Sequence, residues 1–374
     1  YYDSVTIPLK IKNRSISLKL SKSIFSKFKS ISEKFIHLAF GPTKLHINEK
    51  SILLVEFDPV RYKHFFLSTS KKPSHIIIYN RRRPTVWNST SYTIMKKSNC
   101  KIATSYDLMD KNLKTNIEYG ESLAETKVSS VLLNIDFFES YFSIYNHSFW
   151  KIIEQKFKNL FKKRFLDAIK EIEFANKLLE KYKFSSIIVW SEIGSTEQII
   201  VKLAKKCLIP VVLLQHGLFF DDETDGTNDM NKFQGVFPVD SDEIIVWGSI
   251  GKNHQLKNGV SEEKIQVLGN PYYDRIRNLH TSKNNYILLA TSGPVIENSF
   301  DLTIETIEKN RATIRKICEV VTNLQKNLII KLHPSPDEFD PTSIAREVNP
   351  KIRVHKTGEI SKLIEDCEVF VVID

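Results

Sequence analysis

The chain has 374 residues and a formal net charge of +10 at neutral pH. Its hydrophobic share of 41% and charged share of 26% are ordinary for a globular protein, which excludes disorder, collagen and coiled coil. This length suits two domains better than one core. No apolar run is long enough to span a membrane, and the four cysteines form no disulfide or zinc pattern, so we expect a cytoplasmic protein.

Charge is distributed unevenly along the chain. Residues 1–183 hold 33 Lys and Arg against 17 Asp and Glu, whereas residues 184–374 hold 21 against 27. A basic half indicates an anionic partner, such as a lipid surface, nucleic acid or a phosphorylated acceptor. The alternative is an AT-rich genome that encodes Lys freely, and both explanations stay open.

The first half begins with a basic segment, residues 1–48, which we expect to be peripheral. Apolar runs at 51–57 and 75–79 predict strands of a buried parallel sheet. Over residues 148–183, apolar side chains recur every three or four positions, which predicts an amphipathic helix. Its other faces are rich in Lys, so this helix can lie on an anionic membrane; the alternative is a core helix with solvated lysines.

The remaining elements alternate between strand and helix. A strand at 186–190, a helix at 197–206 and a strand at 211–214 form a βαβ unit. Two successive arrays of this kind predict an α/β protein with two doubly wound, Rossmann-like domains facing a cleft, at 49–240 and 241–374. Further strands are expected at 243–247, 265–268, 286–290, 328–332, 353–355 and 369–373, with helices at 302–324 and 361–365.

Five predicted strands end in polar or glycine-containing turns. Ligands of open α/β sheets bind beyond the carboxyl ends of the strands, so these turns are candidate site segments. A basic turn, Arg81 to Pro84, is either solvated or a contact for an acceptor phosphate or lipid headgroup. The acidic stretch 221–229 lacks the spacing of a calcium loop and is expected to be a surface loop. The five turns are SEIGS (191–195), QHG (215–217), GNP (269–271), TSGP (291–294) and HPSP (333–336).

Three of these motifs carry a resemblance. The runs IPVVLLQHGLF (209–219), LGNPYYDRI (268–276) and KLHPSP (331–336) resemble the GT-B glycosyltransferases of surface and capsular polysaccharide synthesis, which include polysialyltransferases and CDP-glycerol glycerophosphotransferases. The resemblance covers about residues 50–374. It implies transfer of a sugar or polyol phosphate from a nucleotide-activated donor to a surface glycan or lipid-linked acceptor. In that family a Ser/Thr turn and closing helices follow a strand like VFVVID, so we expect the C-terminal domain to be incomplete.

The resemblance also assigns roles to residues. It implies that the catalytic base is His216 or Glu192, and the choice stays open because the acidic loop matches only loosely. Asn270 has a second interpretation as a structural anchor of its turn, together with Asp274. The donor-binding residues that the resemblance implies are His333, Thr291, Ser292, Gly293, Lys331 and Asn270.

Other functions remain as alternatives. The nearest is a nonhydrolysing UDP-N-acetylglucosamine 2-epimerase, although the turns SEIG and TSGP favour transfer. Dispersed lysines without interleaved aromatic residues argue against nucleic acid as a partner, and a catalytically inactive binding module stays open. We expect no cofactor beyond the nucleotide-sugar substrate. None of the motifs above supplies the Asp-x-Asp pair that binds metal in the other large glycosyltransferase fold, so we expect metal-independent chemistry.

Overall fold

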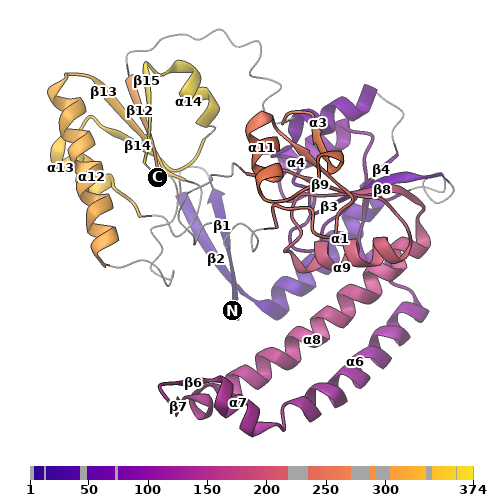
Figure 1. The fold of residues 1–374 in the computed structure, drawn as a ribbon. Helices are drawn as coiled ribbons and strands as arrows, with labels where there is room; N and C mark the ends of the chain where they lie inside the picture. The colour runs from indigo at the N-terminus through magenta and orange to yellow at the C-terminus, as the bar shows by residue number, and fades with distance from the viewer. Residues whose placement is uncertain are drawn as a thin grey trace. The chain divides into compact units, whose positions relative to one another are not determined.

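The chain divides into two compact units, residues 1–274 and 275–374 (Figure 1). Each unit has its own parallel sheet. The α/β class with two Rossmann-like domains is therefore confirmed. The computed structural model describes residues 4–11, 14–42, 49–71, 75–217, 235–270, 286–291, 304–333, 339–358 and 360–373.

Unit 1 contains a parallel sheet in the order β11-β10-β9-β8-β3-β4-β5. Its strands are short and apolar, and β3 and β4 are almost entirely buried, as expected where helices cover both faces. All of these strands except β5 were predicted from apolar runs. The bounds are β3 (Ser51–Val55), β4 (Ile76–Tyr79), β5 (Lys101–Ala103), β8 (Phe184–Val189), β9 (Val211–Leu214), β10 (Glu243–Val246) and β11 (Ile265–Val267).

Alternate residues of these strands enter two separate cores, one on each face of the sheet. Leu53 and Ile77 pack against α5 (Ser105–Leu108), α6 (Lys111–Val131), α8 (Trp150–Lys181) and α9 (Ser195–Lys206). Leu54 and Ile78 pack on the other face against α1 (Lys22–Phe40), α3 (Lys63–Ser68) and α4 (Ser89–Lys97). The period of two along each strand thus produces the three-layer arrangement.

Two predicted boundaries are wrong. Strands β10 and β11, assigned above to the second domain, pair with β9 and extend the first sheet, so the first unit reaches residue 274 rather than 240. The segment 1–48 is not wholly peripheral, because Ile36 and Phe40 of α1 are buried in the first unit's core. It also contains a hairpin of β1 (Ser4–Ile11) and β2 (Arg14–Ser21).

Helices α6 and α8 form a long antiparallel hairpin (Figure 1). The predicted amphipathic helix is α8, but its lysines are not simply a free basic face. Lys170 and Lys177 pair with Glu121 and Asp110 of the α6 segment at 2.8 and 2.7 Å, and Lys162 pairs with Glu125. These ion pairs fasten the two helices to each other.

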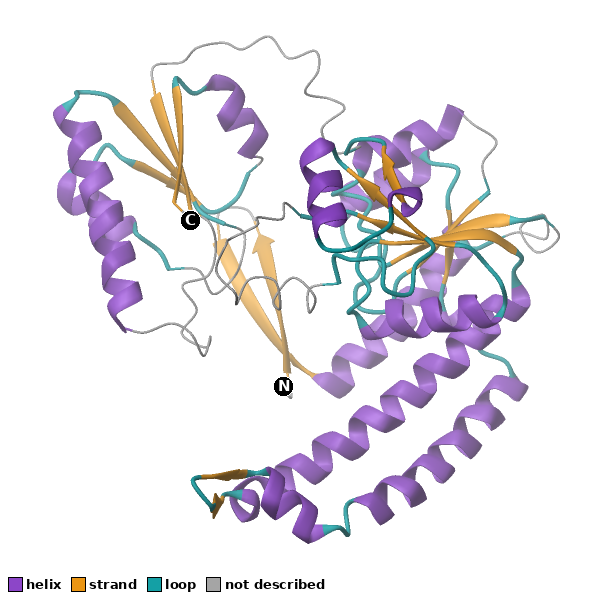
Figure 2. Ribbon diagram, viewed as in Figure 1, coloured by secondary structure: helices purple, strands orange, loops and turns teal. Residues whose placement is uncertain are grey.

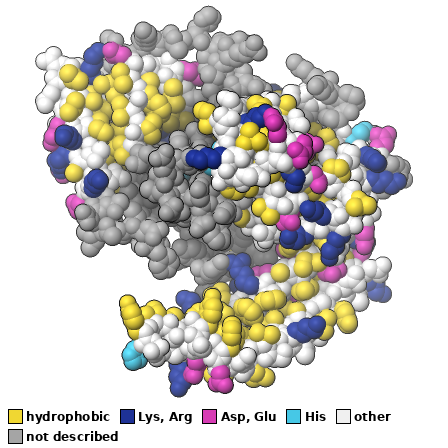
Figure 3. Space-filling view, viewed as in Figure 1, with side chains coloured by type: hydrophobic (Ala, Val, Ile, Leu, Met, Phe, Trp, Pro, Cys, Tyr) yellow, Lys and Arg dark blue, Asp and Glu magenta, His cyan; other side chains and the backbone are white. Residues whose placement is uncertain are grey.

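The end of this hairpin, which we call the hairpin tip, carries α7 (Ile135–Tyr141) and a small ribbon of β6 (Ser143–Ile144) and β7 (His147–Ser148). Tyr145 and Asn146 form its two-residue turn with φ of 50° and 64°. Hydrophobic side chains are prominent along this part of the molecule in Figure 3. The exposed hydrophobic side chains of the hairpin tip are Leu133, Ile135, Phe137, Tyr141, Ile144, Tyr145 and Ile152.

Unit 2 is a smaller version of the same architecture. Its sheet has the order β14-β13-β12-β15, and all neighbouring strands are parallel. Helices α12 (Ile304–Asn323) and α13 (Thr342–Val348) cover one face and α14 (Ile360–Asp366) the other (Figure 2). The strands are β12 (Tyr286–Thr291), β13 (Asn327–Lys331), β14 (Arg353–His355) and β15 (Val369–Ile373), which confirms the predicted second array.

Candidate functional site

The carboxyl ends of the unit 1 strands bring polar side chains to one edge of the sheet. Because neighbouring strands are parallel, the residues that follow them lie at the same edge. This is the edge at which open α/β sheets bind ligands. The polar residues close to these strand ends include Glu56, Asp58, Asn80, Arg81, Arg82, Arg83, Glu192, Gln215, His216 and Asn270.

His216 follows β9 and is held by its neighbours. The buried Gln215 accepts a hydrogen bond from the Trp247 backbone N–H at 2.9 Å, which ties β9 to β10. Arg61 Nη2 donates to the carbonyl oxygen of His216 at 3.0 Å, and the Trp190 ring lies edge-on, 5.9 Å away between centroids. Burial, and then the charge of Arg61, lowers the pKa of His216. A neutral imidazole can accept a proton, which is what a general base requires.

Glu192 lies at the same edge, but its carboxylate is engaged with the backbone. Oε1 accepts the N–H of Ser241 at 2.8 Å, and Oε2 accepts the N–H of Asp240 at 3.0 Å. The residue is only 7% exposed. A buried carboxylate bonded to two amides stabilises the loop before β10, so its geometry suits a structural role.

The expectation of metal-independent chemistry was based on a missing Asp-x-Asp pair, and that ground is wrong, because the sequence holds one such triplet, Asp240–Ser241–Asp242. Asp240 pairs with Lys202 Nζ at 2.6 Å, and Asp242 Oδ2 accepts the Val211 backbone N–H at 2.8 Å. Both carboxylates thus have protein partners in the loop that enters β10. Among the described residues, no three His, Cys, Asp or Glu side chains are grouped so that they could hold a metal ion.

A cavity of about 370 Å³ with several charged side chains in its lining, which we call the arginine pocket, opens where β3, β4 and β8 end. Trp87 is 55% exposed on its wall. The Arg61 guanidinium lies 4.8 Å from the centroid of the Trp190 ring, so the pocket reaches the same two residues that contact His216. The charged and aromatic side chains that line it are Glu56, Asp58, Arg61, Arg82, Arg83, Trp87 and Trp190.

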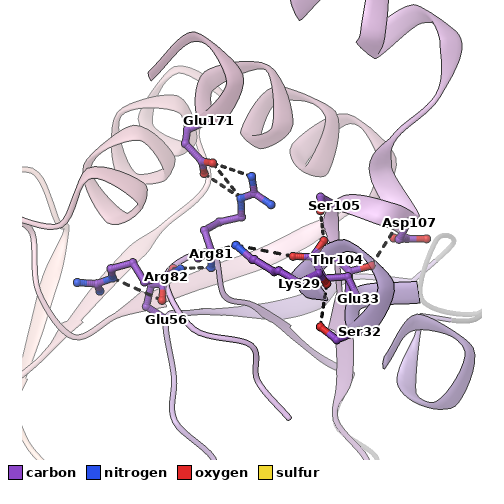
Figure 4. A network of polar contacts seen from close by, with 10 residues as sticks. All are labelled: Lys29, Ser32, Glu33, Glu56, Arg81, Arg82, Thr104, Ser105, Asp107 and Glu171. Carbon is purple, nitrogen blue, oxygen red and sulfur yellow. Dashed lines mark hydrogen bonds and ion pairs between the residues drawn. The ribbon is translucent and has the colours of Figure 1, made fainter. Parts of the chain in front are cut away.

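The basic turn after β4 is held by hydrogen bonds and ion pairs with buried and partly buried acidic residues, so it is not simply solvated (Figure 4). Glu56, with a left-handed backbone (φ 60°), accepts the N–H groups of Arg81 and Arg82 at 2.6 and 3.0 Å. The Arg81 side chain makes a bidentate pair with Glu171 of α8, with its shortest contact at 2.7 Å. The Arg82 guanidinium contacts Glu56 and the fully buried Glu197. The turn therefore has a fixed shape.

Asn270 lies in unit 1, which corrects its expected place in the second domain. It follows β11 and Gly269, whose φ of 87° is a conformation that suits glycine. Together with Phe57, Tyr62 and Trp247, it lines a mostly apolar cavity of about 230 Å³ at the ends of β3, β8, β9 and β10. Any ligand contact of Asn270 would therefore be made from the first sheet.

Unit 2 brings two of the expected donor residues together. Thr291 ends β12, and its Oγ1 accepts the backbone N–H of His333 at 3.2 Å, so the turns after two adjacent strands meet. The buried Lys331 ammonium donates to two backbone carbonyl oxygens at 2.7 and 3.1 Å, which fixes the end of β13. Ser292 and Gly293 lie outside the described residues.

Several residues at the arginine pocket were missed from the sequence. Glu56 lies inside the strand predicted at 51–57, and it follows a strand only because β3 ends at Val55, so the strand-end rule that selected Glu192 and His216 passed over it. Arg61 belongs to the segment after that strand and approaches His216, 155 positions away, only through the fold. Glu197 reads as an ordinary acidic residue in the first turn of a helix, and no sequence signal predicts its complete burial.

Three solved structures are distantly similar to this chain, each with a TM-score below 0.5. A UDP-GlcNAc 2-epimerase from Neisseria meningitidis, solved with UDP-GlcNAc, has 13% identity and a TM-score of 0.46, covering 87% of this chain and 78% of its own. Os79 from O. sativa, solved with UDP, has 9% identity and a TM-score of 0.43, covering 86% and 76%. The calicheamicin glycosyltransferase CalG4 has 9% identity and a TM-score of 0.37, covering 87% and 74%.

The sequence itself gives the clearest assignment. No curated protein matches the chain in a sequence comparison. A family model described as the LIC12162 family transferase matches residues 14–373, which is nearly the whole chain. The chain therefore belongs to the LIC12162 family of transferases.

Proposed function

We propose that this transferase moves a sugar, or a polyol phosphate, from a nucleotide-activated donor to a surface glycan or a lipid-linked acceptor. The observation that carries the proposal is His216, a partly buried histidine with a lowered pKa beside an open pocket lined by charged side chains, at the ligand-binding edge of a parallel sheet. The membership of a transferase family and the GT-B-like motifs support the same reaction class.

In this proposal His216 is the general base. It removes the proton from the acceptor hydroxyl as that oxygen attacks the donor carbon or phosphorus. Glu192 is the weaker candidate, because both of its oxygens accept backbone N–H groups. His333 and Thr291 stabilise the negative charge that develops on the departing nucleotide phosphate. Lys331 acts as a positioning residue, since its ammonium holds the backbone on which His333 stands.

The hairpin tip supports a second part of the proposal, contact with an anionic membrane that presents the acceptor. Its exposed aromatic and aliphatic side chains are those of an interfacial anchor. Residues 127–163 hold six Lys and three Asp or Glu, so the surrounding charge is positive overall. None of the described helices combines the length and apolar character needed to cross a membrane.

Product analysis with candidate nucleotide donors tests the reaction. Calorimetry against CMP, CDP, UDP and GDP first identifies the nucleotide, and mass spectrometry then follows sugar or polyol phosphate transfer from the matching donor to lipid-linked glycans.

His333→Ala should retain much of the nucleotide affinity while slowing transfer on the order of 100- to 1,000-fold, because it removes a group that acts mainly in the transition state. Near-normal turnover would show that the turn at His333 is only structural.

The same assay separates the alternatives. An epimerase would convert the nucleotide sugar without any acceptor, whereas a transferase releases the nucleotide only when an acceptor is glycosylated or phosphorylated. We propose that transfer needs no metal ion, so chelation with EDTA should leave the rate unchanged. Loss of turnover on chelation, restored by a divalent cation, would contradict that part.

A further inference from the structure

The arginine pocket contains more cationic and aromatic groups than a general base needs. Arg83 is exposed, and among the described residues it makes no ion pair or hydrogen bond. Within the same described part of the chain, Arg82 uses Nε and Nη2 for its contacts with Glu56 and Glu197, and no contact engages its Nη1. Arginine donors left in an open cavity of about 370 Å³ are suited to an anionic ligand.

The acids near the pocket do not cancel this preference. The Glu56 carboxylate is nearly buried, accepts two backbone N–H groups and forms an ion pair with Arg82. Asp58 Oδ1 accepts the backbone N–H of Val60 at 2.8 Å. Among the side chains that line the pocket, the three arginines Arg61, Arg82 and Arg83 outnumber the two carboxylates of Glu56 and Asp58. Glu197, which also contacts Arg82, is fully buried and does not line the pocket.

The aromatic walls indicate what else the ligand carries. Trp87 exposes more than half of its surface, and Trp190 forms another part of the wall. An exposed tryptophan beside charged side chains offers a flat apolar face on which the C–H face of a sugar ring packs. Arginines beside tryptophans therefore fit a sugar that bears an oxyanion.

We propose that the arginine pocket binds the sugar acceptor through an oxyanion that the acceptor carries, a phosphate or a carboxylate, with Arg83 and Arg82 as the ligands of this oxyanion and Trp87 as the platform of the sugar ring. That the bound sugar is the acceptor rests on the proposed function. Arg61 and Trp190 join the pocket to His216, so an acceptor held there has its ring next to the proposed base. The pocket thus selects anionic acceptors over neutral ones.

Binding measurements on the whole chain test this without relying on turnover. The probes are glucose 1-phosphate, glucuronate, methyl glucoside and inorganic phosphate, measured by calorimetry and by tryptophan fluorescence. Both anionic sugars should bind more tightly than methyl glucoside, and the tighter of the two identifies the oxyanion. Arg83→Gln should weaken the anionic sugars and inorganic phosphate alike by roughly ten- to a hundredfold, because a charged hydrogen bond is lost.

Two further variants make the result specific. Trp87→Ala should weaken glucose 1-phosphate several-fold and leave inorganic phosphate unchanged, since only the sugar contacts the ring. Arg346→Gln removes an exposed arginine of α13 in the other unit and should change nothing. Unfolding midpoints confirm that each variant is folded.

Three outcomes would overturn the proposal. One is equal binding of methyl glucoside and the anionic sugars, and another is wild-type affinity in Arg83→Gln. The third is displacement of glucose 1-phosphate by the free nucleotide in wild type, which would assign the pocket to the donor. If binding behaves as expected but no transfer product is found with any donor, the anionic pocket stands and the proposed reaction fails.

Discussion

His216 shows how two neighbours set the protonation of one side chain. Burial is the larger cause of its lowered pKa, and the Arg61 charge acts in the same direction. In the unfolded chain the imidazole binds a proton near pH 6.5, whereas in the folded protein it does so only at lower pH. The contribution of His216 to stability is therefore complete above about pH 6.5 and is lost as the pH falls toward its folded pKa.

The rate of transfer should follow this titration. We expect kcat to stay constant on the acidic side of neutrality and to fall only below about pH 6.5, where His216 becomes protonated. Arg61→Gln should move this acidic limb to higher pH, because it removes a repulsive charge, and Arg61→Lys should leave it nearly in place. His216→Ala should abolish the limb together with most of the rate. A limb that survives in His216→Ala would place the base elsewhere.

Glu192 gives a contrasting prediction. Glu192→Gln puts an amide N–H₂ opposite one of two backbone N–H donors, so a buried hydrogen bond is lost. We expect the free energy of unfolding to fall by about 2 kcal/mol, measured by urea denaturation. The acidic limb of the rate should remain, since the residue does not take the proton. If the variant is as stable as wild type but loses the limb, the roles of Glu192 and His216 are reversed.

At the scale of elements, the helical hairpin combines a stiff stem with an apolar tip. Beneath the tip, Phe138 and Phe142 stack on Trp150, with interplanar angles of 14°. Phe157 packs edge-on against Trp150, with centroids 5.3 Å apart. This small aromatic core supports the exposed side chains above it, so polar substitutions of those side chains should not unfold the hairpin.

Liposome flotation tests what the tip does. The chain should float with vesicles that contain anionic lipid, and much less with neutral vesicles, because apolar insertion and lysine attraction act together. The double variant Tyr145→Ser, Ile152→Ser should lose most of this binding.

The matched control is Ile250→Ser, which removes another strongly exposed apolar side chain, in α11 (Ser249–Lys257). It should bind vesicles as wild type does. Equal flotation of all three proteins, or none in any of them, would remove the membrane from the proposal.

The elements also show what the sequence could reveal. Buried parallel strands such as β3, β8 and β12 were predicted within about two residues, because continuous apolar runs bounded by polar turns are specific to them. Strand β5 is only three residues long, Lys101–Ala103, and is too short to give a periodic signal. The hairpin tip was missed because its short helix and ribbon are stabilised by contacts with α8 rather than by local pattern.

For the whole molecule, the sequence predicted two units but placed the border wrongly. Local patterns reveal that β10 and β11 are strands, but not which sheet they join, since this depends on pairing with β9. The same limit applies to the candidate site. His216 and Thr291 could be selected because they follow strands, whereas the approach of Arg61 to His216 is a product of tertiary folding.

The two units should respond separately to core mutations. All four tryptophans, Trp87, Trp150, Trp190 and Trp247, belong to unit 1, so their fluorescence reports on that unit alone. Ile330→Ala creates a cavity in the core of unit 2 and should destabilise that unit by about 3 kcal/mol. Urea unfolding followed by circular dichroism should then show an earlier transition that fluorescence does not detect. Coincident shifts of both signals would mean that the units unfold as one.

The length of α8 fixes the distance between the hairpin tip and the sheet of unit 1. Trp150 lies at the tip and Phe174 in the core beneath the sheet, 24 positions apart along one continuous helix. At about 1.5 Å per residue this spans roughly 36 Å. If the tip binds a bilayer as proposed and the hairpin stands upright on it, the sheet of unit 1 is held at a fixed height above the lipid headgroups. Acceptors of such an enzyme must extend across that gap, which favours chains that are already several sugars long over a sugar attached directly to its lipid.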